Sequence, residues 1–341
     1  MKKLLTVAAV LASVLGARAQ APEPAGLVVG LGNFFSPIVS DLDKAIAFYR
    51  DGLGLDIQGA PANADQNPAL RNMFGLPDAQ LRWAVGRPPA MRTGVEIVEV
   101  KKAESRPIER RIQDPGAFTL ILIVRELDPI LARLKTMGAP VVTTGGAPVD
   151  VPFGGKARGV VVKDPDGHFV ELVQPPPGEA PAPGAANIIS VRVRLTVEDA
   201  GQTMRQYQQL GLAGTMNVMF ESSAPVLKMF GLKAEAQYRV AAMDVPNGPK
   251  LEFIDFKGVD RRTVRANIQD PGSTRMQLQV RDVDAVIESL KAAGGAVVST
   301  GGSTVALPGR GGATTKVAIV RDANNLFLVL IQAAPAPART P

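Results

Sequence analysis

Residues 164–172 read Asp-Pro-Asp-Gly-His-Phe-Val-Glu-Leu, a tight turn that leads directly into a short strand. Aspartate, proline and glycine each favour turn backbone, and the apolar residues that follow Gly167 are typical of a strand. A second apolar run, residues 160–162, precedes the turn. The stretch therefore predicts a β-hairpin.

The residues before this hairpin predict a mixed α/β pattern. We expect strands over residues 34–39, 95–100 and 119–124, from short apolar runs and from alternation of apolar with charged residues. A helix is expected to begin at Asp41, and another to span residues 128–137 before Gly138. The resulting order of elements is β-α-β-β-β, and it occurs twice before the Pro-rich stretch at residue 175.

Three sequence motifs recur 156 residues later. Ile112-Gln113-Asp114-Pro115-Gly116 returns at 268–272, Met73-Phe74-Gly75-Leu76 returns at 229–232, and the motif at 141–146 returns at 297–302. A period this long exceeds that of solenoid repeats and indicates a duplicated domain. We predict one domain over 28–176, a Pro-rich linker over 177–186, a second domain over 187–333 and a disordered tail over 334–341.

The first 19 residues are typical of an export signal. Lys2 and Lys3 precede an apolar run over residues 4–15, and Ala17-Arg18-Ala19 fits a cleavage site. The run is shorter than the ~20 residues that a membrane-spanning helix needs. We expect a secreted or periplasmic protein without a membrane span, and an uncleaved anchor is the alternative.

Composition narrows the function classes. The chain has no cysteine, so neither a disulfide scaffold nor a cysteine nucleophile is available. Without the three basic residues of the signal, 35 basic residues face 32 acidic ones, and the basic residues are scattered. Nucleic-acid binding is therefore not expected.

Two motifs resemble the vicinal oxygen chelate superfamily, which includes glyoxalases, bleomycin-resistance proteins and extradiol dioxygenases. Residues 39–49, Val-Ser-Asp-Leu-Asp-Lys-Ala-Ile-Ala-Phe-Tyr, resemble the opening of its module, and residues 164–172 resemble the closing hairpin. The resemblance implies an α+β fold with two tandem domains. In each domain, paired β-α-β-β-β modules would form an open, curled mixed sheet around a cavity.

The same resemblance implies where a metal would be held. Metal-dependent members bind a divalent cation through His residues of each first strand and Glu residues of each last strand. The last-strand positions carry Glu96, Glu171 and Glu252, but Val329 stands at the fourth. Counting along each first strand places Phe34, Thr119, Arg192 and Arg275 where His is expected. The metal sites are therefore expected to be degenerate, and only Glu96 and Glu171 remain as candidate ligands of a divalent metal.

The residues that replace the ligands suggest two different cavities. The first domain would enclose a mainly apolar pocket with Phe34, Thr119 and Ile121, and Trp83 and Phe74 could add an aromatic wall. The second would place Arg192 and Arg275 beside Glu252 and Gln277. Two guanidinium groups there suit an anionic ligand, and a buried charge network without a ligand is the alternative.

His168, the chain's only histidine, has opposite strand parity to Glu171 and is not expected to share a metal with it. We expect a turn-adjacent residue that is partly exposed or helps to order the loop, with a proton carrier at a pocket rim as the alternative.

These patterns favour an exported protein that binds a small organic molecule without a cofactor, and they leave its enzymatic status open. One alternative is a metal-dependent lyase, isomerase or dioxygenase that uses Glu96 and Glu171. Another is a non-catalytic interaction module.

Overall fold

The computed structural model describes residues 27–89, 91, 93–152, 156–178, 186–308 and 313–333. The expected export signal, most of the expected linker and the expected tail lie outside the described residues. Their roles therefore stay predictions. No helix in the described part of the chain is long and apolar enough to cross a membrane.

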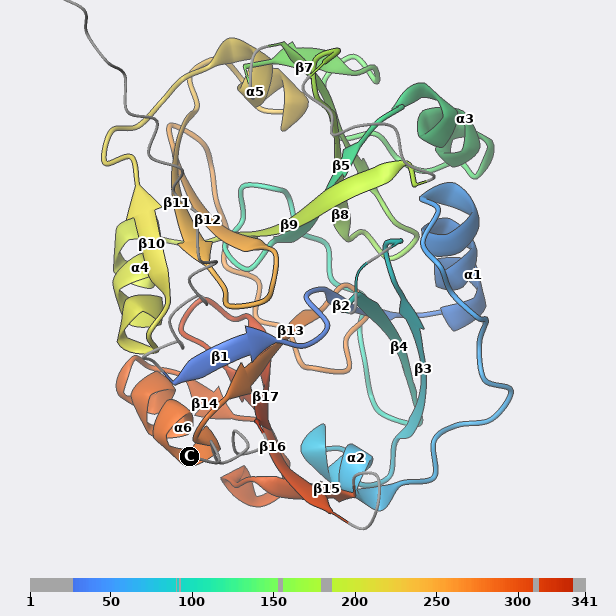
Figure 1. The fold of residues 1–341 in the computed structure, drawn as a ribbon, viewed down its shortest axis with the longest axis vertical. Coiled ribbons are helices and arrows are strands. Elements are labelled where there is room, and N and C mark those ends of the chain that lie inside the picture. The colour runs from blue at the N-terminus through green and yellow to red at the C-terminus, as the bar shows by residue number, and fades with distance from the viewer. Residues whose placement is uncertain are drawn as a thin grey trace, which may run out of the picture.

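Each quarter of the chain forms one module in which a strand and a helix are followed by further strands (Figure 1). In the described residues the second module has the order β-α-β-β-β, the first has one strand fewer, the third has a second helix and the fourth has an extra strand. A short strand, β1 (Val28–Leu31), precedes the first module. The first module contains β2 (Ser36–Val39), α1 (Leu42–Ala47), the π-helical turn η1 (Phe48–Gly52), α2 (Pro68–Met73), β3 (Gln80–Gly86) and β4 (Val95–Lys101). The second contains β5 (Phe118–Val124), α3 (Asp128–Thr136), β6 (Val149–Val151), β7 (Ala157–Lys163) and β8 (Phe169–Gln174).

The second half repeats this order. The third module contains β9 (Ile188–Thr196), α4 (Ala200–Gln209), β10 (Ala213–Met216), α5 (Ala224–Met229), β11 (Gln237–Asp244) and β12 (Lys250–Lys257). The fourth contains β13 (Thr274–Val280), α6 (Val283–Ala292), β14 (Ala296–Val297), the short helix η2 (Thr300–Gly302), β15 (Val305–Pro308), β16 (Thr314–Arg321) and β17 (Phe327–Gln332).

Local sequence explains where these elements begin and turn. The Asp41 carboxylate caps α1 by accepting hydrogen bonds from the backbone amides of Asp43 and Lys44. Gly167, in the hairpin turn between β7 and β8, has a φ of 89°, which side chains other than glycine adopt rarely. Its counterpart in the second half is Asn325, with a φ of 64°, and asparagine tolerates this conformation better than most residues. The predicted hairpin is confirmed.

The two sheets are assembled across the halves of the chain. One sheet follows the order β14-β16-β17-β13-β2-β4-β3, and the other follows β10-β11-β12-β9-β5-β8-β7-β6. The first module thus pairs with the fourth through antiparallel contact of β2 with β13. The second module pairs with the third through β5 and β9, whose register runs from Phe118 opposite Leu195 to Val124 opposite Ile188. The expected α+β class with open mixed sheets is confirmed, but each sheet takes one module from each half.

The apolar core follows the same division. The largest cluster contains residues of α1, α3, α4 and α6, together with one face of each sheet. Two smaller clusters lie on the other faces. One joins β5, β7 and β8 to α5, β11 and β12, and the other joins α2, β3 and β4 to β16 and β17. These smaller clusters form the walls of the two cavities described next.

Candidate functional site: two cavities of different chemistry

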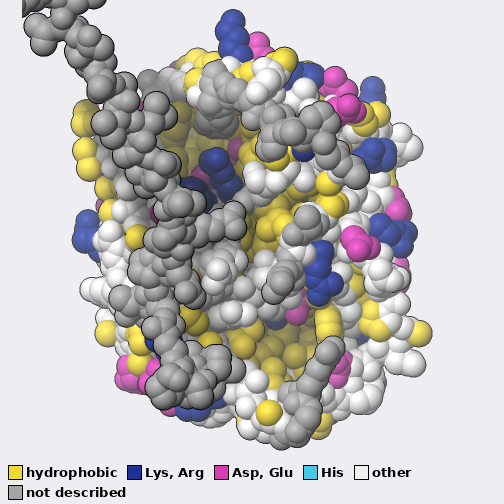
Figure 2. All heavy atoms as spheres, viewed as in Figure 1, with side chains coloured by type: hydrophobic (Ala, Val, Ile, Leu, Met, Phe, Trp, Pro, Cys, Tyr) yellow, Lys and Arg dark blue, Asp and Glu magenta, His cyan; other side chains and the backbone are white. Residues whose placement is uncertain are grey.

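The first cavity, cavity 1, lies in the sheet formed by the first and fourth modules. It has a volume of about 330 Å³. Its lining is mainly apolar: Leu70, Met73, Phe74, Leu81, Trp83, Glu96, Val98, Arg275, Gln277, Leu307, Pro308, Thr315, Val317, Val329 and Ile331. On the face drawn in Figure 2, hydrophobic side chains line a hollow in the lower half of the molecule. A cavity of this size and polarity suits a small organic ligand.

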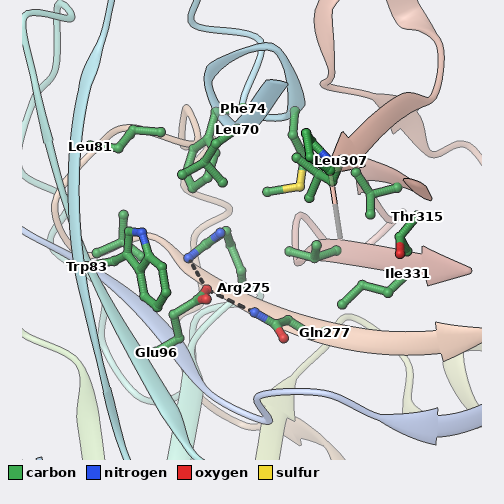
Figure 3. A pocket seen from close by; sticks show the side chains of 15 residues that line it. Leu70, Phe74, Leu81, Trp83, Glu96, Arg275, Gln277, Leu307, Thr315 and Ile331 are labelled. Carbon is green, nitrogen blue, oxygen red and sulfur yellow. Dashed lines mark hydrogen bonds and ion pairs between the residues drawn. The ribbon is translucent and has the colours of Figure 1, made fainter. Parts of the chain in front are cut away.

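Three polar side chains meet at one wall of cavity 1 (Figure 3). Glu96 accepts two hydrogen bonds at Oε2, from an Arg275 terminal nitrogen at 2.8 Å and from Gln277 Nε2 at 2.9 Å. The Gln277 Oε1 atom accepts from the backbone amide of Asn33, which fixes the orientation of the amide. Among the described residues, no donor reaches Glu96 Oε1, and the Glu96 side chain keeps 17% of its surface exposed.

Arg275 is held in place by Glu96 and Phe74. Its side chain is 1% exposed, and its guanidinium lies 4.6 Å from the centre of the Phe74 ring. Burial lowers the pKa of Arg275 below its ordinary value, and the Glu96 carboxylate opposes that shift. Arg275 and Glu96 form an ion pair with no net charge. The Glu96 Oε1 atom is the acceptor that remains for a ligand.

The second cavity, cavity 2, lies in the sheet formed by the second and third modules and is larger, at about 580 Å³. Its lining combines apolar and charged side chains: Ile121, Ile123, Pro152, Glu171, Val173, Pro175, Ser190, Arg192, Arg194, Asn217, Glu221, Val226, Phe230, Tyr238, Val240, Glu252 and Ile254. In the upper half of the same view, charged side chains lie within a hydrophobic hollow (Figure 2).

Arg194 links the two buried carboxylates of cavity 2. One terminal nitrogen lies 2.5 Å from Glu171 Oε2, while Nε and the other terminal nitrogen lie 2.9 and 2.8 Å from Glu252 Oε2. Burial opposes the charge of Arg194, but the two carboxylates raise its pKa above the ordinary value. Burial raises the pKa of Glu171, and Arg194 opposes that rise. The three groups form a buried charge network.

The predicted site residues lie in two cavities, and they are not grouped as the sequence predicted. Cavity 1 contains Glu96, Arg275 and Gln277, and cavity 2 contains Ile121, Glu171, Arg192 and Glu252. The expectation that Arg192 and Arg275 share one cavity is wrong. The expectation that Glu96 and Glu171 flank one metal is wrong for the same reason: β2 pairs with β13 and β5 pairs with β9, so each cavity draws on both halves.

Two predicted cavity residues line neither of these cavities. Phe34 is fully buried in the largest core cluster, and Thr119 is 2% exposed. The alternative to an anion site was a buried charge network around Glu252. This expectation is correct for Arg192, because a terminal nitrogen of Arg192 lies 3.3 Å from Glu252 Oε1. Phe74 and Trp83 both line cavity 1, but none of Phe34, Thr119 and Ile121, the residues expected to share a pocket with them, does so.

Cross-strand register shows which first-strand residues lie beside the last-strand positions. Ile121 lies opposite Glu171, Arg194 opposite Glu252 and Gln277 opposite Val329. The bridges Phe35–Val95 and Ile38–Val98 place Ser36 beside Glu96 in the same way. These four neighbours are each two residues further along the strand than the predicted positions. Because side chains alternate, a shift of two keeps the same face.

The donor set of neither cavity fits a divalent metal. The matched first-strand and last-strand positions at cavity 1 carry Ser36, Glu96, Gln277 and Val329. They supply a single carboxylate, Glu96, and its Oε2 atom already accepts hydrogen bonds from Arg275 and Gln277. The two buried carboxylates of cavity 2, those of Glu171 and Glu252, both accept hydrogen bonds from Arg194. No group of three or more His, Asp or Glu side chains with metal-binding geometry occurs among the described residues.

His168 lies away from both cavities and is buried, so the expectation of partial exposure is wrong. Its Nδ1 lies 2.9 Å from Asp164 Oδ2, and its Nε2 lies 3.0 Å from the carbonyl oxygen of Ser273. Asp164 Oδ2 also accepts from the Tyr49 hydroxyl at 3.0 Å. The residue does order the turn, because the Asp164 carboxylate also accepts from the backbone amide of His168.

Both ring nitrogens of His168 face acceptors, so the ring needs two protons and is favoured as the imidazolium. Burial alone would lower the pKa of His168, but Asp164 and the Ser273 carbonyl raise it above the ordinary 6.5. A raised pKa in the folded state stabilises the protein below about pH 6.5, and this stabilisation is lost as the pH rises through the folded-state pKa.

We therefore expect an NMR titration of this single histidine to give a pKa above 6.5, and urea unfolding to show lower stability at pH 9 than at pH 6. His168→Gln should remove that difference. A pKa at or below 6.5 would show that Asp164 and the Ser273 carbonyl do not stabilise the imidazolium beyond the cost of its burial.

Paired β-α-β-β-β modules around two open cavities define the vicinal oxygen chelate class of protein. Residues 33–172 match the model of the Glyoxalase/Bleomycin resistance protein/Dioxygenase superfamily. The match covers the first two modules, which make up less than half of the chain.

Similar solved structures agree on the fold. Glyoxalase I from Zea mays has 19% sequence identity and a TM-score of 0.54, over 89% of this chain and 92% of that chain. A proposed dioxygenase from Bacillus subtilis has 14% identity and a TM-score of 0.50, over 92% and 88%. A search of curated proteins found no significant match. At these identities the structural likeness shows the fold alone.

Proposed function

We propose that the protein binds a small organic molecule in cavity 1, without a metal. The observation that carries this proposal is the Glu96 Oε1 atom, to which no described residue donates a hydrogen bond, within an apolar cavity of about 330 Å³. A carboxylate oxygen in apolar surroundings favours a hydrogen-bond donor from a ligand over another acceptor. The ligand would have an apolar body and one N–H or O–H group.

The walls of cavity 1 support a flat ligand. Trp83 on β3 is 40% exposed and lines the cavity opposite the side chains of β15 and β16 (Figure 3). Aromatic side chains bind flat rings by offset stacking or edge contacts. Because Arg275 is already paired with Glu96 and is almost fully buried, it gives little support to an anionic ligand here.

An anionic ligand in cavity 2 is the second candidate. Arg192 favours one, since its side chain is 49% exposed and its single ion pair is long at 3.3 Å. Three carboxylates, of Glu171, Glu221 and Glu252, share the lining with two guanidinium groups, and they disfavour a further negative charge. The proposal of a donor ligand in cavity 1 is therefore preferred.

Trp83 is the only tryptophan of the chain, so selectively excited fluorescence reports on cavity 1. We expect phenol to change this fluorescence saturably, and anisole, which lacks the donor, to bind more weakly. Indole and N-methylindole fluoresce themselves, so this second pair is compared by isothermal titration, with the same order of affinity expected. Glu96→Gln should weaken phenol or indole binding about 10- to 100-fold, since a hydrogen bond to a charged group contributes about 1.5–3 kcal/mol.

The matched control is Glu221→Gln, which makes the same change at the lining of cavity 2 and should leave the affinity of cavity 1 unchanged. Equal binding of the donor and donor-free members of each pair, or full affinity in Glu96→Gln, would rule out Glu96 as the recognition group.

A further inference from the structure

Cavity 2 contains a cation that belongs to the chain itself. The Arg194 guanidinium lies between Glu171, on β8, and Glu252, on β12, and it contacts both carboxylates at 2.5–2.9 Å. Its side chain is 9% exposed, and those of Glu171 and Glu252 are 1% and 8% exposed. Two buried carboxylates this close to one cationic group would repel each other strongly without it.

The elements that supply these groups are the ones that would supply a metal site. Both carboxylates come from last strands of paired modules, and Arg194 comes from a first strand, directly opposite Glu252 in the register of β9 and β12. Ile121 holds the corresponding first-strand place beside Glu171. Two carboxylates thus remain in position, but the other two inward places carry a guanidinium and an apolar side chain.

We propose that Arg194 takes the place of a divalent cation in cavity 2. Arg192 completes the charge balance: its contact with Glu252 Oε1 brings a second guanidinium to the pair of carboxylates. Among the side chains of the first and last strands, two guanidinium groups therefore face two carboxylates, which is the balance that a divalent ion would supply. The third carboxylate of the lining, Glu221, lies outside these strands and accepts hydrogen bonds from Asn217 and Tyr238. The planar guanidinium also donates several fixed hydrogen bonds, so it orients both carboxylates as well as neutralising them.

Cavity 1 shows the same charge balance with one guanidinium group and one carboxylate. Val329 stands where a second carboxylate would be, and one guanidinium, Arg275, pairs with the remaining Glu96. In both cavities the number of guanidinium groups matches the number of inward carboxylates. This agreement between two independent sites supports substitution of metal by arginine over a chance ion pair.

The proposal predicts that removing the guanidinium uncovers a cation site. Carboxylate oxygens with water suit a hard divalent ion, so Arg194→Ala should bind about one Mn²⁺ per chain, at least tenfold more tightly than the unaltered protein in isothermal titration. The matched control is Arg192→Ala, which removes the half-exposed cation of the same strand and should gain no site. Adding Glu171→Gln and Glu252→Gln to Arg194→Ala should abolish the binding.

Arg194→Ala leaves two carboxylates unpaired and could fail to fold in the absence of metal. In that case Mn²⁺ should restore a cooperative thermal transition, and Arg194→His, which adds an imidazole to the two carboxylates, should bind Zn²⁺. Stoichiometric Mn²⁺ binding by the unaltered protein that is lost in Glu171→Gln would overturn the proposal. So would folded Arg194→Ala and Arg194→His variants that bind neither ion better than the unaltered protein.

Discussion

Replacing Asp164 by alanine is expected to lower the free energy of unfolding by about 3–5 kcal/mol, the cost of removing one partner of a buried ion pair. The Asp164 side chain is fully buried and accepts hydrogen bonds from the Tyr49 hydroxyl, His168 Nδ1 and the backbone amides of Asp166 and His168. The substitution would leave the imidazolium of His168 without its counter-charge. Urea unfolding followed by circular dichroism would measure the change.

The internal repeat supplies a matched control at Asp322. This residue accepts from the Tyr207 hydroxyl at 2.9 Å and from the backbone amides of Asn324 and Leu326, as Asp164 does with its own neighbours. The position of His168 is taken by Leu326, so no cation depends on Asp322. Asp322→Ala should therefore cost less, about 1–3 kcal/mol for unsatisfied neutral donors. Equal losses in the two variants would show that the charge of His168 contributes nothing.

The environment of His168 shows one limit of reading the sequence. Strand parity correctly separated this residue from Glu171, and the turn residues predicted the hairpin in which it lies. Its burial depends on the Ser273 carbonyl, which is 105 positions away and belongs to another module. No local pattern carries that information, because exposure in a turn depends on what packs over it.

The two cavities show the same limit on a larger scale. Alternation along β9 places Arg192 and Arg194 on one face, and the resemblance to the superfamily located the last-strand carboxylates. The alternation that specifies a face does not specify a partner. All four first strands contain apolar residues, so either pairing of modules would bury them. The choice of β2 with β13, and of β5 with β9, is made by the tertiary contacts of the whole chain.

Cross-half contacts extend well beyond the sheets. The Arg110 guanidinium donates to the Val264 carbonyl at 3.1 Å, and the Asp270 carboxylate accepts from the backbone amide of Arg106 at 3.0 Å. The reciprocal loop makes the equivalent contact, since the Asp114 carboxylate accepts from the backbone amide of Arg262 at 3.0 Å. The duplicated Asp-Pro-Gly loops therefore hold the two halves to each other, with Asp114 and Asp270 both fully buried.

Expressed alone, residues 28–176 are expected not to fold as a monomer, even though they contain one complete repeat. In isolation β2 would lose β13 and β5 would lose β9, which exposes two sheet edges and one side of each cavity. The third module repeats the first and the fourth repeats the second, so two copies of the fragment could pair module one with module two of the partner. We expect a dimer by analytical ultracentrifugation, and an unfolded chain at concentrations too low for pairing.

Mixing this fragment with residues 187–333 should give a one-to-one complex that rebuilds both cavities. Trp83 fluorescence would report on the assembly, because Trp83 lies in the first half while Leu307, Val317 and Ile331 across cavity 1 lie in the second. A folded, monomeric 28–176 with a cooperative thermal transition would contradict this expectation. It would mean that the modules of one half can pair with each other, and that the arrangement in the full chain is one of two stable pairings rather than a requirement of the fold.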